Sequence, residues 1–429
     1  MKKLFFILAI ALFAACTNDE EMSILTETMP EESISVEKRS FQEALEVAQG
    51  APEIFGGTTT RGELKQVTLA DTQYIISEAS TRNESPDTLM YVFNYENNQG
   101  FAVVSANKNT EALIAVTEQG SYNKETEVKN PGLALYLNMA RTYVENNDFY
   151  PSDTIIGGGN GNYPLTEYKE ETTTTITADY GPLLELRWGL GYPYNFHCQN
   201  SSNLPISAGC EVVALAQLFS FYEYPTNMLI DYNPNNVHSL PINWDLFKSH
   251  PRHINCNCGT STLLDLAYMF RQIGEELNIE YQNNSSSANF YDIMSYFSKL
   301  NYSHSGMIDY NTTTISNSLS NNNLVIIQGV EDGETMGHAW LIDGYKSIKT
   351  TIEEYRRTMG QIKWTLYKTT TSYESYQHFN WGYDGDSNGY YATNVFDMDR
   401  CSYLDEGVDE HNELYEFKNN IKIIANINH

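Results

Sequence analysis

The apolar residues in the second half of the chain change their spacing once, and this change constrains the fold more than any other feature. Between residues 209 and 300 they repeat at helical spacing, which predicts a long helix beginning near Gly209 and two more over about 262–277 and 288–300. Beyond Leu324 the pattern becomes that of short strands with polar turns between them. Helices first and antiparallel strands afterwards predict an α+β domain with a helical lobe and a sheet lobe.

The first half of the chain predicts a second, smaller α+β unit over residues 34–147. Helical spacing over 34–49 and an amphipathic segment that Pro131 opens indicate two helices, because proline is tolerated in the first turn of a helix. A chain of 429 residues is long enough for two such units, each with its own core. Short strand-like runs lie between the two helices, at 73–76, 88–95 and 100–105.

Two biased segments separate the units. Residues 157–162 (GGGNGN) are rich in glycine, and residues 169–177 (KEETTTTIT) are rich in threonine. Runs of this kind are typical of flexible boundaries that proteases cut. The glycines do not form a phosphate-binding motif, because no Lys-Ser or Lys-Thr pair follows them.

The N-terminal residues predict export. Two lysines precede the apolar run 4–13, which is too short to span a bilayer as a helix and is typical of a secretory signal peptide. The next residues, 14–16 (AAC), resemble the lipobox of bacterial lipoproteins, in which the cysteine is lipidated. We therefore expect residues 1–16 to be a lipoprotein signal with Cys16 as the lipidated residue. A plain signal peptide followed by a chance cysteine fits the same residues.

The residues after the signal predict a tether rather than a second anchor. Residues 17–33 are acidic and rich in serine and threonine, which is typical of a solvated linker. No later apolar run is long enough to cross a membrane, so the expected contact with the membrane is through the N-terminal lipid only. The expected location is extracytoplasmic, attached to the cell envelope and either exposed at the surface or released after processing.

The charge of the chain argues against nucleic-acid partners. Lys and Arg total 26 and Asp and Glu total 55, so the net charge is −29. A field of this sign repels phosphate backbones. It does not identify the neutral or basic substrates that would bind.

The cysteine count allows a reactive thiol. If Cys16 carries lipid, five of the six cysteines remain, and an odd number in an oxidising compartment leaves at least one thiol unpaired. Without Cys210, the other four allow three disulfide pairings. The five cysteines are Cys198, Cys210, Cys256, Cys258 and Cys401.

Cys210 has the sequence context of a nucleophile. Small residues (207–209, SAG) precede it and an amphipathic helical run follows it, so its sulfur is expected at the first turn of a helix. There the helix N-terminus favours thiolate over thiol and lowers the thiol pKa. The position alone fits equally well a buried cysteine that fills a contact between a helix and a sheet.

His338 supplies the base that such a thiol needs. It stands at the start of an apolar strand, in 337–345 (GHAWLIDGY), where it is the only titratable residue between Met336 and Ile342. A histidine on a strand of a second lobe can face a helix N-terminus across a cleft. The separation from Cys210 is 338 − 210 = 128 residues, close to that of papain-like enzymes. Alone, His338 would be read as a structural histidine, but the pair favours catalysis.

Several segments together resemble the streptopain-like cysteine peptidases. GCEVVALAQLFSFYEYP (209–225) and GHAWLIDGY (337–345) are similar to the catalytic cysteine and histidine blocks of that family. The resemblance spans most of the chain after the N-terminal linker. Further similar segments are RWGLGYPYN (187–195), NWD (243–245) and HFNWGYDGDSNGYY (378–391), and GFAVVSANKN (100–109) resembles a motif in the family's prosegment.

The resemblance implies a papain-like, two-lobed catalytic domain preceded by a small α+β prodomain. It assigns residues 34–160 to an inhibitory prosegment, 161–177 to a cleavable linker and 178–429 to the cysteine peptidase domain. The implied activity is endopeptidase action on extracellular proteins or peptides, by a zymogen whose own prosegment is its intramolecular inhibitor. No cofactor or metal is implied beyond a reduced thiol.

By the same resemblance, Cys210 attacks the scissile carbonyl, and His338 acts as base and then as acid toward the leaving amine. Asn380 corresponds to the position that orients the histidine, and Trp381 to the adjacent aromatic residue. An Asn-Trp pair at the end of a strand could equally shield the core.

One residue departs from the family pattern. Leu190 occupies the position two residues after Trp188, where the family carries a glutamine that is a candidate donor to the oxyanion. Loss of one such donor costs about 10²–10³ in rate. The alternative hypothesis is therefore a catalytically impaired homologue that acts as a surface binding or adhesion module. A third hypothesis, a protease inhibitor, predicts a short chain without the catalytic blocks.

Two possible metal motifs are incomplete. Residues 384–389 (DGDSNG) match the first half of a calcium loop, but Val395 stands where the bidentate glutamate is needed. His253, Cys256 and Cys258 lie close together in sequence without a fourth zinc ligand at suitable spacing. We therefore predict a polar turn between two strands at 384–389 and no metal site.

Overall fold

The structure is a computed structural model. The expected signal peptide with Cys16, the 17–33 linker and the stretch 157–162 lie outside the described residues, as do His253 and the three cysteines at 256, 258 and 401. All described residues belong to one unit, Val36–His429. The described residues are 38–56, 68–77, 87–147, 166–231, 237–252, 259–281, 288, 290–329, 337–358, 361–396 and 421–429.

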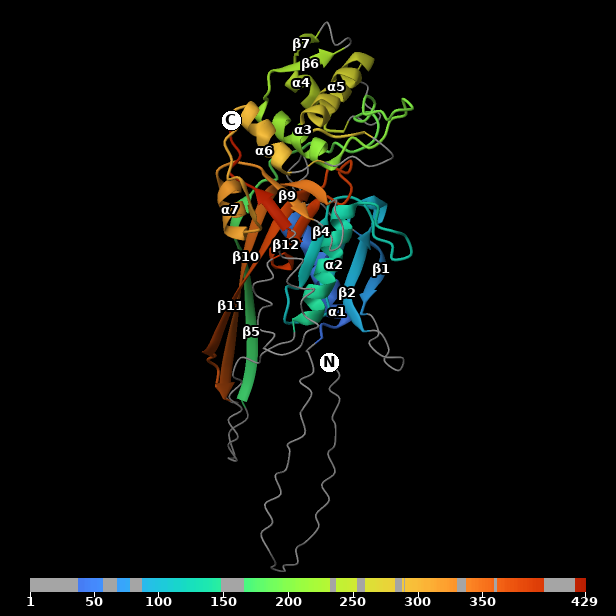
Figure 1. Cartoon of the computed structure of the whole chain (residues 1–429). Coiled ribbons are helices and arrows are strands. Elements are labelled where there is room, and N and C mark those ends of the chain that lie inside the picture. Colours follow the sequence, from blue (N-terminus) through green and yellow to red (C-terminus); the bar gives the residue numbers. More distant parts are fainter. Residues whose placement is uncertain are drawn as a thin grey trace, which may run out of the picture. The chain divides into compact units, whose positions relative to one another are not determined.

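The elements follow the expected order, strands and two helices first, then helices, then strands (Figure 1). The helices are α1 (Phe41–Phe55), α2 (Pro131–Asn146), α3 (Cys210–Tyr222), α4 (Trp244–Lys248), α5 (Thr260–Glu276), α6 (Phe290–Lys299) and α7 (Thr312–Ser320). The strands are β1 (Leu69–Ile76), β2 (Thr88–Tyr95), β3 (Phe101–Ser105), β4 (Leu113–Thr117), β5 (Thr166–Tyr180), β6 (Asn227–Asp231), β7 (Val237–Pro241), β8 (Met307–Asp309), β9 (Val325–Gly329), β10 (His338–Thr358), β11 (Thr365–Asn380), β12 (Gly389–Ala392) and β13 (Ile421–Ile424).

One antiparallel sheet runs through both expected units. Its order is β1-β2-β3-β4-β12-β11-β10-β9-β13-β8, and β5 pairs with the far part of β10. The four N-terminal strands therefore continue directly into the C-terminal sheet, where β4 pairs with β12 through Val116 opposite Tyr390 and Thr117 opposite Gly389 (Figure 1). The prediction of a mixed α+β chain with an antiparallel sheet and a helical lobe is confirmed.

The two N-terminal helices begin where their sequences cap them. Ser40 and Glu43 form a reciprocal capping box at α1, which satisfies two backbone N–H groups that the helix cannot. At α2 the side chain of Asn130 accepts hydrogen bonds from two backbone N–H groups, and Pro131 occupies the first position as expected. Both helices pack their apolar faces on the N-terminal strands, which places α2 next to β10 as well.

The helical lobe is built around α3. Every residue from Glu211 to Ser220 is buried, because α3 lies between β10 and the helices α4 and α5. Trp188, Phe219 and Phe270 are fully buried members of the hydrophobic core of this lobe. A helix buried on all sides holds its first residue in a fixed place, which matters for the site below. No helix among the described residues is long and apolar enough to cross a membrane.

Residues 166–177 differ from the expected flexible linker. They form most of β5, which pairs with β10 from Thr166 opposite Thr358 to Tyr180 opposite Tyr345. Threonine favours strands because its branched side chain fits a pleated surface, even though almost none of β5 is buried. Together with β11 on the other side of β10, β5 forms a three-stranded ribbon that extends beyond the rest of the sheet (Figure 1).

Candidate active site

Cys210 is the first residue of α3, as predicted. Gly209 before it has φ 100°, a left-handed conformation that favours glycine, and this turn brings the chain into the helix. The backbone N–H of Ala339 donates to Cys210 Sγ over 3.4 Å. The sulfur therefore lies at the start of β10, beside the residue that follows His338.

His338 is the first residue of β10 and is buried. Its Nε2 lies 3.3 Å from the carbonyl oxygen of Trp381, and its ring stacks near those of Trp340 and Trp381, at centroid distances of 5.9 and 6.4 Å. Burial lowers the pKa of His338 to about 4, against a smaller opposing contribution of the Trp381 carbonyl. The imidazole is therefore neutral and is turned toward Trp381.

The N-terminal unit covers this histidine. A Cβ added to Gly132, in the first turn of α2, would lie 2.6 Å from His338 Cδ2 and 2.5 Å from Trp381 Cζ3. On the same side, the Tyr383 hydroxyl donates to the carbonyl oxygen of Lys129 over 2.7 Å. The start of α2 thus lies in direct contact with two of the four predicted catalytic or supporting residues.

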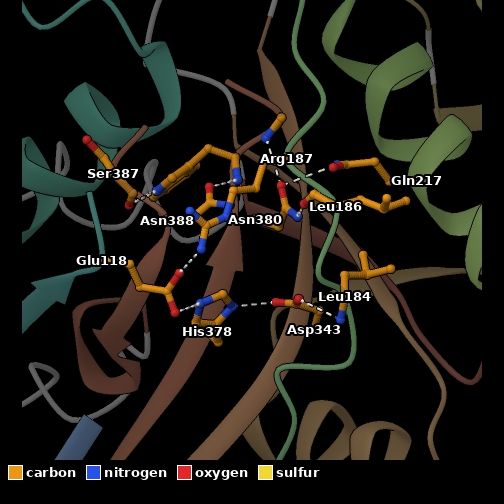
Figure 2. A network of polar contacts seen from close by, with 12 residues as sticks. Glu118, Leu184, Leu186, Arg187, Gln217, Asp343, His378, Asn380, Ser387 and Asn388 are labelled. Atoms are coloured by element: carbon orange, nitrogen blue, oxygen red, sulfur yellow. Dashed lines mark hydrogen bonds and ion pairs between the residues drawn. The ribbon is translucent and has the colours of Figure 1, made fainter. Parts of the chain in front are cut away.

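Asn380 is buried at the end of β11 and holds a chain segment in place (Figure 2). Its Nδ2 donates to Leu186 O over 2.8 Å, and its Oδ1 accepts from Gln217 Nε2 and from the Gly382 N–H. Gln217 Oε1 in turn accepts from the Trp188 N–H over 3.2 Å. In this state none of these Asn380 hydrogen bonds reaches His338, so Asn380 positions the segment 186–188.

Trp381 is fully buried and anchored at both ends. Its indole Nε1 donates to Ser387 O and to the Tyr391 hydroxyl, each at 3.0 Å, and its backbone N–H donates to Asn388 Oδ1. The bonds to Ser387 and Asn388 tie Trp381 to the polar turn predicted at 384–389, which in the structure ends at Asn388 because Gly389 begins β12. The carbonyl oxygen of Trp381 is thereby held where it contacts His338.

The structure reveals a charged network that the sequence did not indicate. His378 Nδ1 lies 2.6 Å from Asp343 Oδ1, and His378 Nε2 lies 3.5 Å from Glu118 Oε1 (Figure 2). Glu118 Oε2 is 3.2 Å from Arg187 Nη2. Burial alone lowers the pKa of His378, but Asp343 and then Glu118 outweigh it and raise this pKa to about 10. A carboxylate after β4 is therefore bound by two cationic side chains of the C-terminal unit.

A second residue that the sequence analysis missed adjoins Cys210. The Cys210 thiol donates to Glu211 Oε2 over 3.2 Å, and the Glu211 side chain is fully buried. Burial and then the charge of Glu211 raise the pKa of Cys210 well above its ordinary value. The lowered thiol pKa expected from the helix N-terminus does not hold in this state of the protein. Glu211 follows Cys210 directly in the sequence, but only the fold shows that its side chain is buried beside the sulfur.

The remaining sequence candidates have simpler outcomes. Leu190 is half-buried, and its carbonyl oxygen accepts from the Ala208 N–H over 3.0 Å. Cys198 is buried and free, so it takes part in no disulfide in this structure. Burial raises the pKa of its thiol to about 11. Within the described ranges, no group of three or more histidine, cysteine or acidic side chains is placed to hold a metal ion.

Known proteins match both units. Residues 188–391 match the Peptidase C10 family, and residues 35–144 match the Spi protease inhibitor family. The chain is 21% identical over 341 residues to the thiol protease/hemagglutinin PrtT of Porphyromonas gingivalis, an alignment that covers 73% of this chain and 34% of PrtT. It is 20% identical over 394 residues to streptopain of Streptococcus pyogenes, covering 83% of this chain and 84% of streptopain. The chain thus spans about a third of PrtT and most of streptopain.

A solved structure shares the fold. It is a fragment of prointerpain A from Prevotella intermedia, with a TM-score of 0.50 and 18% identity, and the match covers 83% of this chain and 99% of that chain. The inhibitor match falls on α1, β1–β4 and α2, and the peptidase match falls on the region that holds Cys210 and His338. Residues 188–391 thus form a peptidase domain of the Peptidase C10 family, and a domain of the Spi protease inhibitor family precedes it at residues 35–144.

Proposed function

We propose that this chain is the zymogen of a secreted, lipid-anchored cysteine endopeptidase, with Cys210 as nucleophile and His338 as base. The observation that carries the proposal is the 3.4 Å hydrogen bond from the Ala339 N–H to Cys210 Sγ, because it holds the start of α3 beside His338. A thiol at a helix N-terminus next to an imidazole is the arrangement that nucleophilic catalysis by cysteine requires.

In the proposed active state, His338 turns from the Trp381 carbonyl toward Cys210 Sγ and takes the thiol proton. The thiolate attacks the scissile carbonyl carbon, and the imidazolium gives its proton to the leaving amine, which leaves an acyl-enzyme. His338 then takes a proton from a water molecule as the water oxygen attacks the acyl carbon. The imidazolium returns this proton to the sulfur as the thiol departs. The backbone N–H of Cys210 has no intrahelical acceptor in the first turn and is the proposed donor to the oxyanion.

The contacts of the prosegment support latency. Gly132 at the start of α2 lies against His338 and Trp381, so the imidazole cannot move freely while α2 is in place. Pairing of β4 with β12 and the contacts of Glu118 with Arg187 and His378 hold the prosegment beside the site. Removal of the prosegment would free His338 to reach the sulfur.

The pairing of β5 bears on where activation cleavage occurs. A peptidase binds its substrate as an extended, unpaired segment, whereas β5 is hydrogen-bonded to β10 from Thr166 to Tyr180. Cleavage inside β5 would first require this pairing to open. We therefore place the cleavage before Thr166, and β5 stays with the mature peptidase.

Export and lipid attachment rest on the N-terminal sequence. The lysines, the apolar run 4–13 and the lipobox-like AAC at 14–16 support a lipoprotein signal with Cys16 as the anchored residue. Metabolic labelling with a radioactive fatty acid would test this: Cys16→Ala should abolish the label, whereas persistent label in that variant would exclude Cys16 as the attachment point.

Leu190 favours a second candidate, a catalytically impaired homologue that serves as a surface binding or adhesion module. Its apolar side chain cannot donate a hydrogen bond to an oxyanion, and loss of such a donor costs about 10²–10³ in rate. The Cys210 and His338 pair counts against this candidate, because a binding module has no physical need for it.

A comparison of purified protein from residue 17 onward with its Cys210→Ala variant tests the proposed function. Both are incubated with reductant and casein. We expect the parent to shorten by about the length of the prosegment and to digest casein, while the variant stays intact. If the parent stays silent even after an added protease has released the peptidase domain, the binding module becomes the better explanation.

A further inference from the structure

The carboxyl group of Glu211 lies directly beside the sulfur of the proposed nucleophile. Glu211 is the second residue of α3 and is fully buried. The Cys210 thiol donates to its Oε2 over 3.2 Å, while Oε1 has no hydrogen-bond partner among the described residues. Burial of an acid with an unpartnered oxygen is unfavourable, so a plain packing role does not explain this side chain.

The Cys210 thiol and the Glu211 carboxyl group are close enough to share one proton. Two anions 3.2 Å apart in buried surroundings repel each other strongly, so the pair loses its protons in separate steps. Burial raises the pKa of Glu211 to about 7, although nearby backbone N–H groups and the thiol act in the opposite direction. Burial and the charge of Glu211 raise the pKa of Cys210.

The neighbouring elements leave the pair without a cation among the described residues. On β10, His338 is neutral, because burial lowers its pKa to about 4. On α5, Arg271 pairs with Glu275 and lies over the ring of Tyr281, whose hydroxyl donates to Ala208 O. On α4, Lys248 pairs with Glu223 at the opposite end of α3. The thiol proton is therefore shared with Glu211.

We propose that Glu211 is a positioning residue for the peptidase reaction, which holds the proton of Cys210 on the sulfur while His338 is turned away. The inference rests on the proposed role of Cys210 as nucleophile. The step exchanges one proton between Sγ and Oε2 and changes no other bond. When His338 reaches the sulfur, the proton passes to the imidazole, and the imidazolium offsets the carboxylate. Glu211 thereby links reactivity of the thiol to arrival of the base.

The test measures alkylation of Cys210 by iodoacetamide in the intact, unprocessed chain between pH 5 and 9, followed by peptide mass. In the parent, the rate should show an inflection near pH 7, where Glu211 titrates. Glu211→Gln should lose this inflection and react about 3–10-fold faster at pH 8, because loss of the carboxylate charge lowers the thiol pKa and gives more thiolate, of somewhat lower nucleophilicity.

Two further variants make the test decisive. Glu211→Val removes the charge without adding an amide donor and should also react faster, and it serves if the glutamine variant fails to fold. Glu223→Gln, at the exposed end of the same helix, should match the parent. Equal pH profiles for the parent and both Glu211 variants would overturn the inference. Alkylation needs no proteolysis, so the two failures are distinguishable: an inactive chain with a changed profile would contradict the proposed function, while still showing that Glu211 controls the protonation of Cys210.

Discussion

Gly132 of the prosegment lies against the ring of His338, with no space for a side chain between them. A Cβ at this position would come within 2.6 Å of His338 and 2.5 Å of Trp381, and both rings are buried. Such distances are shorter than real contacts, so one of the partners would have to move. The close packing of α2 on the proposed base therefore requires that residue 132 has no side chain.

Gly132→Ala should loosen the prosegment. The added methyl group overpacks the contact with His338, which costs about 1–3 kcal/mol, and α2 can relieve it by moving away. We expect faster alkylation of Cys210 in the unprocessed chain and earlier self-processing. Gly50→Ala is the matched control, since a Cβ there meets nothing within 4 Å. Equal alkylation rates for the two variants would show that α2 does not restrain the site.

Glu118→Gln should weaken the hold of the prosegment in a salt-dependent manner. The change keeps the shape of the side chain but removes the charge that faces Arg187 and His378. Because the Arg187 pair is partly exposed, the expected loss is modest, about 1 kcal/mol or less, and the alkylation rate should rise by up to about fivefold.

Salt provides the control for this prediction. Rising ionic strength screens exposed charges, so the parent should approach the rate of the Glu118→Gln variant while the variant changes little. Glu125→Gln alters an exposed carboxylate in the segment between β4 and α2 and should behave as the parent. A parent rate that is independent of salt would mean that Glu118 does not act through its charge.

Asp343→Asn should destabilise the folded chain because it removes the partner of a buried histidine. Asp343 and His378 are 0% and 3% exposed, and loss of one member of a buried pair costs about 3–5 kcal/mol. The pKa of His378 is raised to about 10, so its protonated form stabilises the fold fully below about pH 6.5, its ordinary pKa, and this stabilisation is lost as pH rises through 10.

Urea unfolding at several pH values measures whether this stabilisation decreases as pH rises. The stability difference between the parent and Asp343→Asn should be largest near pH 6 and should shrink toward pH 10. Asp309→Asn, which removes the partner of Lys422 at the surface, should change stability by no more than about 0.5 kcal/mol. A difference between parent and Asp343→Asn that stays constant with pH would contradict a charged His378.

The local parts of the site could be predicted from the sequence. Helical spacing after Gly209 and the apolar strand after His338 are properties of short segments, and both begin where expected. The Pro131 helix start is predicted for the same reason. What could not be predicted is the state of the site, because His338 is packed against Gly132, a residue 338 − 132 = 206 positions away.

The other features that the sequence did not predict are contacts between residues far apart in the chain and the exposed strand β5. Glu118 and His378 come from different units and meet only because β4 pairs with β12, which no local pattern indicates. Asn380 was expected near the histidine, but its side-chain hydrogen bonds in this state go to Leu186, to Gln217 of α3 and to Gly382. The ribbon strand β5 contains no buried residue and so lacks the buried alternation from which strands are recognised, which is why its threonine-rich sequence was interpreted as a linker.

The pairing of β5 predicts the N-terminus of the processed enzyme. N-terminal sequencing of the mature product from the full chain should give a start at or before Thr166, because residues from Thr166 onward are paired with β10. Thr173→Pro should disturb this, since Thr173 lies opposite Thr351 in the middle of the pairing and proline cannot donate its backbone hydrogen bond. We expect additional cleavage within β5 in that variant. Thr173→Val keeps a β-branched residue and should process as the parent does. A parent N-terminus between residues 167 and 180 would show that β5 opens before cleavage, and that the ribbon does not protect this segment.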